Sequence, residues 1–231
     1  MEPIIEVKDV TKIYKVGTER IVALDKVNLT INKGEFCCLL GTSGSGKSTL
    51  LNVMAGIEKI TSGEIIIRNR KINKMSEREL SVFRQKYLGF IFQSYNLVPA
   101  LTAYENVELP LIFKEIVPKK RKIMVRQILD SVGLSKRAKH KPSQMSGGQQ
   151  QRVGIARAFV SSPEIVFADE PTGNLDTKTT MEIMTLIKSI AKEYNQTIVM
   201  VTHDSRIAEF ADKVISIHDG NIASVEEKDN I

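Results

Sequence analysis

The sequence predicts an α/β protein built on a parallel sheet, with an antiparallel β subdomain and an inserted helical subdomain. Near both ends of the chain, apolar segments of strand length alternate with helical segments, as in a parallel sheet with helical crossovers. Two segments within residues 1–31 alternate apolar and polar residues, which is typical of half-buried strands. The middle of the chain, residues 94–161, instead shows helical periodicity.

The first half of the chain contains most of the expected strands. Residues 36–40 are continuously apolar, which indicates burial on both faces of a sheet. A glycine-rich loop follows them, and we expect a helix over residues 47–55. The other strands expected here cover residues 6–14, 23–31, 63–67 and 89–93.

The second half returns from helices to strands. We expect helices over residues 119–132, 149–160 and 179–193, and strands over residues 165–168, 197–201, 214–217 and 221–225. Asp219-Gly220 joins the last two strands and is a strong hairpin signal. The whole chain, residues 1–231, is expected to form one domain. Residues 1–93 and 162–231 would make its core and β subdomain, and residues 94–161 its helical subdomain.

Composition limits the class of protein. The 231 residues are 42 % apolar and 26 % charged, as in ordinary soluble globular proteins. No apolar run reaches the roughly 18 residues that a membrane span needs, and residues 1–6 do not resemble a signal peptide. We therefore expect the chain in the cytoplasm or on the cytoplasmic face of a membrane. The net charge of +6, concentrated in Lys119–Lys122 and Lys136–Lys141, is compatible with nucleic acid, an anionic membrane, a nucleotide or simply solvated surface.

The glycine-rich loop is the strongest functional signal. It reads Gly41-Thr42-Ser43-Gly44-Ser45-Gly46-Lys47-Ser48 and matches the P-loop pattern G-x-x-x-x-G-K-[ST]. Backbone N–H groups of such a loop surround phosphate oxygens, and the following helix start favours the same anion. Lys47 would reach the outer phosphates and the Ser48 hydroxyl would bind Mg²⁺. Because a strand precedes the loop and a helix follows it, a flexible linker is the weaker interpretation.

Polar residues at the ends of other strands complete a triphosphate site. Asp169 and Glu170 follow residues 165–168, so Asp169 would lie beside the metal and Glu170 would accept a proton from the attacking water. His203 follows another strand, where it could hydrogen-bond the γ-phosphate, and the amide of Gln93 could bind Mg²⁺ or water. Taken singly, each residue could instead be structural. Their combination with the P-loop favours catalysis.

A further segment allows a family to be named. Residues 145–152, Met-Ser-Gly-Gly-Gln-Gln-Gln-Arg, closely resemble the LSGGQ signature of ATP-binding cassette (ABC) ATPases, with Met145 in place of leucine. The P-loop, Gln93, the signature, Asp169-Glu170 and His203 occur in the family's order and cover essentially the whole chain. The resemblance implies an ABC nucleotide-binding domain, a P-loop NTPase with an antiparallel β subdomain and a helical subdomain that carries the signature.

The resemblance also implies residue roles. In this family two cassettes enclose two ATP molecules head to tail, so the signature would contact the γ-phosphate held by the partner cassette. Tyr14 would stack on adenine, although a strand-packing tyrosine is the alternative. Asp176 lies in a segment that resembles the D-loop, where Gly173-Asn174 replaces the commoner Ser-Ala. The implied ATP-binding residues are Tyr14, Gly41, Thr42, Ser43, Gly44, Ser45, Gly46, Lys47, Ser48, Thr49, Ser146, Gly147, Gly148, Gln149 and Asp176. The implied Mg²⁺ ligands are Ser48, Gln93 and Asp169, and the implied catalytic residues are Glu170, His203, Lys47 and Gln93.

Three segments narrow the resemblance to a subgroup. Residues 90–97, 105–111 and 169–176 are similar to ATPases of lipoprotein release, macrolide export, peptide-antibiotic export and cell division. This implies a homodimer of cassettes, peripheral on the cytoplasmic face of the membrane, that drives a separate permease for export or mechanical signalling. An ABC ATPase that acts on nucleic acid or ribosomes is the alternative, but a single cassette without sustained heptads argues against it, and no nucleic-acid partner is expected.

Overall fold

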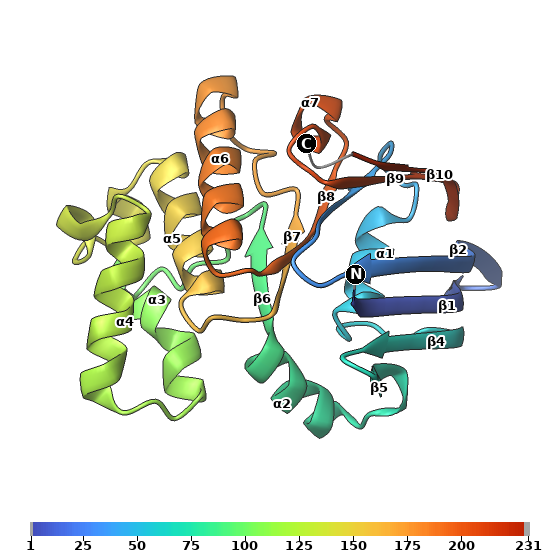
Figure 1. The fold of residues 1–231 in the computed structure, drawn as a ribbon, viewed down its shortest axis with the longest axis horizontal. Helices are drawn as coiled ribbons and strands as arrows, with labels where there is room; N and C mark the ends of the chain where they lie inside the picture. Colours follow the sequence, from blue (N-terminus) through green and yellow to red (C-terminus); the bar gives the residue numbers. More distant parts are fainter. Residues whose placement is uncertain (1, 229–231) are drawn as a thin grey trace.

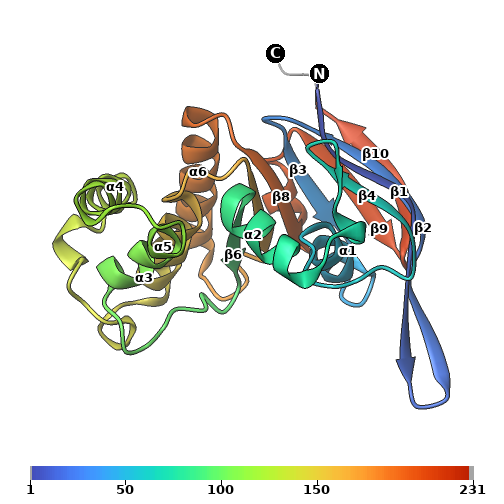
Figure 2. The same cartoon turned by 90° about the horizontal axis from the view of Figure 1, so that it is seen from below.

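The computed structural model describes residues 2–228 and contains a small antiparallel sheet (Figure 1). Met1 and residues 229–231 of the predicted domain lie outside the described residues. The strands of this sheet are ordered β2-β1-β4-β5, and all of its pairings are antiparallel. The bounds are β1 Pro3–Val16, β2 Glu19–Asn32, β4 Ser62–Ile67 and β5 Arg70–Lys71. The expected antiparallel β subdomain is confirmed, and Figure 2 shows its β1–β2 hairpin extending away from the rest of the molecule.

The larger sheet is parallel except at one edge. Its order is β10-β9-β3-β8-β7-β6, and only the β10–β9 pairing is antiparallel among the pairings described. The bounds are β3 Phe36–Leu40, β6 Leu88–Phe92, β7 Ile165–Asp169, β8 Thr197–Thr202, β9 Lys213–His218 and β10 Asn221–Glu227. Asp219 and Gly220 have φ values of 45° and 75°, as the predicted hairpin turn requires. The α/β fold class is therefore confirmed.

Helices cover the parallel sheet. They are α1 Lys47–Met54, α2 Glu77–Tyr87, α3 Ala103–Phe113, α4 Pro118–Ser131, α5 Gly147–Phe159, α6 Thr177–Glu193 and α7 Ser205–Ala208, with short 3₁₀ turns at Ile72–Lys74, Ser135–Arg137 and Pro142–Gln144. In both views α3, α4 and α5 gather on the same side of the molecule (Figures 1 and 2). Helix α2 was not among the elements expected from the sequence, although Ser76 and Glu79 form a capping box at its start.

The continuous apolar runs are explained by burial on both faces of the parallel sheet. Successive residues of a strand point to opposite faces, so Cys37 packs in the apolar cluster on the α1 side while Cys38 packs in the cluster formed by α3, α5 and α6. In β7, Phe167 likewise packs in the cluster on the α1 side and Ala168 in the cluster on the opposite face. None of the helices within residues 2–228 is long and apolar enough to span a membrane.

Strand register decides where the functional loops meet. Leu40 of β3 lies opposite Thr202 of β8, and Asp169 of β7 lies between Phe92 of β6 and Val201 of β8. Because these strands are parallel, the segments after their carboxyl ends emerge at the same edge of the sheet. The P-loop, Gln93, Glu170 and His203 all follow these ends.

Candidate active site

The P-loop, residues 41–48, has a backbone that only glycine fits at two points. Gly46 has a φ of 100°, and a Cβ atom there would lie 2.5 Å from the carbonyl oxygen of Ala23. A Cβ atom on Gly41 would lie 2.3 Å from the carbonyl oxygen of Ile217. Gly46 is the N-cap of α1, and no side chain among the described residues caps this helix start. The N–H groups of the first turn are therefore available to an anion, which fits a bound phosphate.

Lys47 turns its side chain into the loop. Its Nζ donates hydrogen bonds to the carbonyl oxygen of Thr42 at 2.6 Å and to Ser45 Oγ at 3.5 Å. Burial lowers the pKa of Lys47, and the nearby carboxylates of Glu170 and Asp169 act in the opposite direction. Neutral oxygens are the direct partners of this buried ammonium group. A phosphate oxygen would be a stronger partner, because hydrogen bonds between charged groups exceed those to neutral ones.

Ser48 and Asp169 bring two oxygen ligands together. Ser48 Oγ, in the first turn of α1, donates a hydrogen bond of 3.1 Å to Asp169 Oδ1 at the end of β7. Burial raises the pKa of Asp169, the hydrogen bond from Ser48 lowers it, and the charge of Glu170 raises it again. A hydroxyl and a carboxylate beside a phosphate-binding loop are the oxygen donors that Mg²⁺ prefers, so these residues fit that ion.

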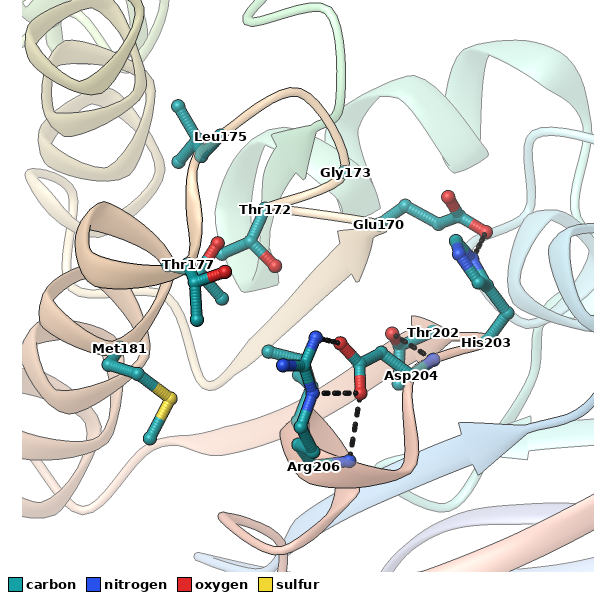
Figure 3. Close-up of a pocket in the computed structure, with 12 residues that line it drawn as sticks. Glu170, Thr172, Gly173, Leu175, Thr177, Met181, Thr202, His203, Asp204 and Arg206 are labelled. Carbon is teal, nitrogen blue, oxygen red and sulfur yellow. Dashed lines mark hydrogen bonds and ion pairs between the residues drawn. The ribbon is translucent and has the colours of Figure 1, made fainter.

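Glu170 and His203 form a second pair of polar residues at this edge. His203 Nδ1 lies 3.0 Å from Glu170 Oε1, and the close-up in Figure 3 shows the two side chains meeting. Glu170 has a φ of 42°, an uncommon value for a residue with a side chain, and its N–H donates to the carbonyl oxygen of Val201 at 3.0 Å. Both side chains line an open cavity of about 590 Å³ together with Gly41, Thr42 and other residues. A carboxylate and an imidazole therefore share a cavity with the P-loop.

Gln93 follows β6, but its side-chain amide points to Asn174 and not to Ser48 or Asp169. Its Nε2 lies 3.5 Å from Asn174 Oδ1, and Asn174 Nδ2 donates to the carbonyl oxygen of Gln93 at 3.1 Å. A Cβ atom on Gly173 would lie only 2.7 Å from Gln93 Nε2. Gly173 and Asn174, which replace the commoner Ser-Ala, therefore both lie against the Gln93 side chain, and a larger residue at 173 would require that flexible side chain to move. The Mg²⁺ role of Gln93 stays a prediction.

The signature and Asp176 lie at neighbouring helix starts. Ser146 caps α5 by accepting from Gln149 N at 3.4 Å, and Asp176 caps α6 by accepting from Thr179 N at 3.0 Å. Hydrogen bonds from Thr179 hold the pKa of Asp176 below its usual value. A Cβ atom on Gly148 would lie 2.8 Å from Thr179 Cγ2, so α5 and α6 approach closely at their first turns. In the single chain these side chains cap helices, and their contacts with ATP stay predictions.

Tyr14 lies in β1 near the start of α1. Its hydroxyl donates to a carboxylate oxygen of Glu58, and Lys12 Nζ lies 4.7 Å from the centre of its ring. Burial and the hydrogen bond to Glu58 raise the pKa of Tyr14. Glu58 therefore fixes the ring orientation, while adenine stacking stays a prediction.

Two residues of α5 that sequence analysis did not assign hold the loops around the site. Gln151, fully buried, donates from Nε2 to the carbonyl oxygen of Pro171, the residue after Glu170. Arg157 donates to the carbonyl oxygens of Tyr95 at 2.8 Å and Asn96 at 2.5 Å. Burial lowers the pKa of Arg157. These bonds join residues far apart in sequence, so no local pattern could have indicated them.

The geometry defines the class of protein first. A phosphate-binding loop at a helix start, a Ser–Asp pair suited to Mg²⁺ and a carboxylate at one edge of a parallel sheet are the parts of a P-loop nucleoside triphosphatase. Residues 24–173 match the family model described as ABC transporter. The chain belongs to the ABC transporter family and is an ATP-hydrolysing cassette of that family.

Curated relatives agree with this assignment. The uncharacterised ABC transporter ATP-binding protein MJ1508 of Methanocaldococcus jannaschii is 47 % identical over 97 % of this chain and 100 % of its own length. The macrolide export ATP-binding/permease protein MacB of Pasteurella multocida is 43 % identical over 96 % of this chain, which spans only 34 % of MacB. Both are named as transporter proteins, so the alternative of acting on nucleic acid or ribosomes is not favoured.

A solved structure is also closely similar. The ATP-binding cassette MJ0796, as a dimer in a post-hydrolysis state bound to ADP and Pi, superposes with a TM-score of 0.90 at 46 % identity. The match covers 97 % of this chain and 98 % of that one. The fold, including the side-by-side placement of both sheets and the helices, is therefore that of a cassette.

Proposed function

We propose that this chain is the ATPase subunit that drives a separate membrane permease, for export or for mechanical signalling across the membrane. Two copies close head to tail around two ATP molecules with Mg²⁺. The observation that supports this most directly is the meeting of Lys47, the Ser48–Asp169 pair and the Glu170–His203 pair at one edge of the parallel sheet. Residues 94–161 act as the helical unit that presents the signature, and residues 1–93 and 162–231 form the ATPase core with the β subdomain.

The chemistry follows from the positions of these side chains. The P-loop N–H groups and Lys47 bind the phosphates, and Glu170 accepts a proton from the water that attacks the γ-phosphate. His203, within hydrogen-bond distance of Glu170, orients that carboxylate and donates to a phosphate oxygen. Mg²⁺, held by Ser48 and Asp169 with Gln93 joining on closure, would neutralise phosphate charge. Tyr14 stacks on adenine, and Thr49 extends the phosphate contacts beyond the loop.

Closure of two chains would complete the site. The Ser146–Gly148 segment lies at the start of α5, where the capping box pairs the N–H groups of Ser146 and Gln149 and leaves those of Gly147 and Gly148 to an anion. Asp176 starts α6 beside it. The similar cassette MJ0796 is a dimer, which supports the same assembly for this chain. Hydrolysis removes the γ-phosphate contacts between the two chains, and the permease follows their opening.

A groove beside the helical unit suits the permease. It has a volume of about 380 Å³ and lies between α2, β6, α3 and α5, where Phe90, Pro110, Phe113 and Arg157 are among its lining residues. Arg157 also holds the backbone after Gln93, so a load on this groove would reach the loop between the groove and the active site. A mainly apolar groove of this kind fits an apolar segment of a membrane protein. The chain would then lie on the cytoplasmic face of the membrane as a peripheral subunit.

Co-purification tests the proposal. Tagged Glu170→Gln chain should bind ATP, hydrolyse it slowly and, in mild detergent with ATP, retain a membrane protein from its native membranes. Lys47→Ala is the control, because loss of the phosphate contact should abolish ATP-dependent dimerisation. Mass spectrometry that finds ribosomal proteins or nucleic acid and no membrane protein would overturn the proposal. Normal turnover by Glu170→Gln would remove Glu170 from its role.

A further inference from the structure

The end of α3, the start of α4 and the connection between them expose a set of large apolar side chains. Phe113 and Val117 are 61 % and 62 % exposed, and Ile112 and Ile123 are 42 % and 52 % exposed. In Figure 1 this connection lies at the lower edge of the molecule, at the same end as α2. Since α2 leads into the amino end of β6, this end is opposite to the carboxyl ends that form the active site. These side chains are therefore not needed for the nucleotide site.

Two of the basic side chains in the same segment are held by other parts of the fold, and the others are not. Lys114 Nζ donates to the carbonyl oxygen of Ser161 at 3.1 Å, and Arg121 Nε donates to Glu108 Oε1 at 2.8 Å. The remaining cations of the segment are Lys119, Lys120 and Lys122, which are exposed. Within residues 2–228 no ion pair joins any of these three to an acidic side chain.

Local stability does not account for the position of these lysines. They stand in the first turns of α4, which contains no acidic residue in its first turn. Cations near a helix N-terminus oppose the helix dipole, so this arrangement weakens α4 slightly instead of stabilising it. An anionic partner would convert the same charges into a favourable contact.

The outer face of α4 mixes apolar and basic side chains. Val125, Ile128 and Leu129 are buried and define its inner face. Ile123 lies on the opposite face, and Lys119 and Lys120 stand one turn before it at the i−4 and i−3 positions. An apolar side chain between cations on an exposed helix face is the pattern of helices that lie on anionic membrane surfaces.

We propose that the basic tip, defined as Ile112, Phe113, Val117, Lys119, Lys120, Lys122 and Ile123, rests on anionic lipid headgroups beside the permease. This inference rests on the proposed function, because Phe113 also lines the groove assigned to the permease. A bilayer lies directly beside a permease, so a surface continuous with that groove is placed to reach it. The exposed aliphatic side chains favour lipid over nucleic acid, since they would insert between headgroups but find no partner on a phosphate backbone.

Vesicle flotation of the whole purified chain, without permease, tests the inference. The vesicles are phosphatidylcholine alone or an equimolar mixture of phosphatidylcholine and phosphatidylglycerol. We expect binding to the anionic vesicles only, and its loss at high salt. Lys119→Gln/Lys120→Gln should weaken the partition coefficient about 25-fold, since each lysine near an anionic surface contributes about fivefold. Ile123→Gln should also weaken binding to the anionic vesicles, even at low salt, because it removes an apolar side chain and no charge.

The second basic segment provides a matched control. Lys136→Gln/Lys139→Gln removes the same charge from exposed positions outside the basic tip, and it should leave vesicle binding within about twofold, since these side chains would lie away from the lipid. All variants should keep the ATPase rate and the melting temperature of the unchanged chain. Equal losses in the two double variants would mean that net charge alone drives binding, and the inference would fail. Binding to a DNA or RNA duplex that depends on Lys119 and Lys120, with no vesicle binding, would also overturn it.

Vesicle binding and co-purification of a membrane protein can fail separately, so the two proposals are tested separately. If a membrane protein co-purifies but the chain does not bind anionic vesicles, only the basic tip is wrong. If the chain binds anionic vesicles but no membrane protein co-purifies, the proposed permease partner is wrong. The basic tip would then still be a lipid-binding surface.

Discussion

Gln151 offers a test of how the signature helix positions Glu170, the proposed catalytic base. Its side chain is fully buried in α5, where Nε2 donates to the carbonyl oxygen of Pro171 and Oε1 has no partner within the described part of the chain. Pro171 directly follows Glu170, whose backbone has an uncommon positive φ. We predict that Gln151→Met releases this segment and lowers kcat without unfolding the protein.

The chain contains a matched control for this substitution. Gln196 is also buried, also donates from Nε2 to a proline carbonyl, that of Pro163 at 2.7 Å, and also has an Oε1 atom without a partner among the described residues. It precedes β8 and therefore lies at the amino ends of the strands, away from Glu170. Gln196→Met removes the same interactions at a site remote from the chemistry.

The expected magnitudes follow from these contacts. Loss of the amide leaves a proline carbonyl unpaired, which costs about 1–3 kcal/mol, but it also removes an unpaired buried oxygen of similar cost. The two effects offset each other, so the melting temperature should change by no more than about 4 °C in either variant. A displacement of Glu170 by about 1 Å can lower the rate about 100-fold. We therefore expect kcat to fall about 10- to 100-fold in Gln151→Met and to stay within about twofold in Gln196→Met.

Steady-state ATPase assays with thermal melts would decide the matter. The KM for ATP should be unchanged in Gln151→Met, because the P-loop is untouched. Equal kcat values in the two variants would refute the positioning role. A large fall in melting temperature confined to Gln151→Met would show that the side chain serves stability, which would also refute it.

The other predictions concern the P-loop and the buried thiols. Lys47→Ala should weaken ATP binding at least about 10-fold, since it removes a hydrogen bond between charged groups, and equilibrium binding of a fluorescent ATP analogue measures this; unchanged affinity would contradict the P-loop assignment. Gly46→Ala should destabilise the fold by more than the about 1–2 kcal/mol that a positive φ costs, because its Cβ would also meet the Ala23 carbonyl 2.5 Å away. Gly44→Ala is the control, because Gly44 has a φ of 81° and no described atom lies within 4 Å of its Cβ position. Its free energy of unfolding in urea should fall only by the cost of the positive φ. Burial raises the pKa of Cys38 from 9.0 to about 12, so the folded chain keeps a proton that the unfolded chain releases. The free energy of unfolding should fall as pH rises from 9 towards 12, and Cys38→Ala should show a shallower fall; an identical slope would contradict this assignment.

Local patterns in the sequence were enough for much of the fold and for the parts of the site. The alternation in β1 and β2, the continuous apolar runs in β3 and β7 and the Asp219-Gly220 turn all depend on backbone sterics and on which side chains can be buried, and these act between near neighbours. The capping box at Ser76 shows that α2 could have been predicted on the same basis. The P-loop and the Asp169-Glu170 pair are likewise short segments whose spacing reflects the chemistry of phosphate and Mg²⁺.

Tertiary structure decided which side chains meet. The order of the strands placed Asp169 between β6 and β8, and packing turned the amide of Gln93 towards Asn174. The bonds from Gln151 to Pro171 and from Arg157 to Tyr95 join residues 20 and 62 positions apart. The sequence alone determined the elements and the chemical groups at their ends, because short-range sterics and burial specify them. Only the tertiary structure decided which of these groups meet. A hydrogen bond between distant elements can form only where the packing of sheets and helices brings donor and acceptor within reach.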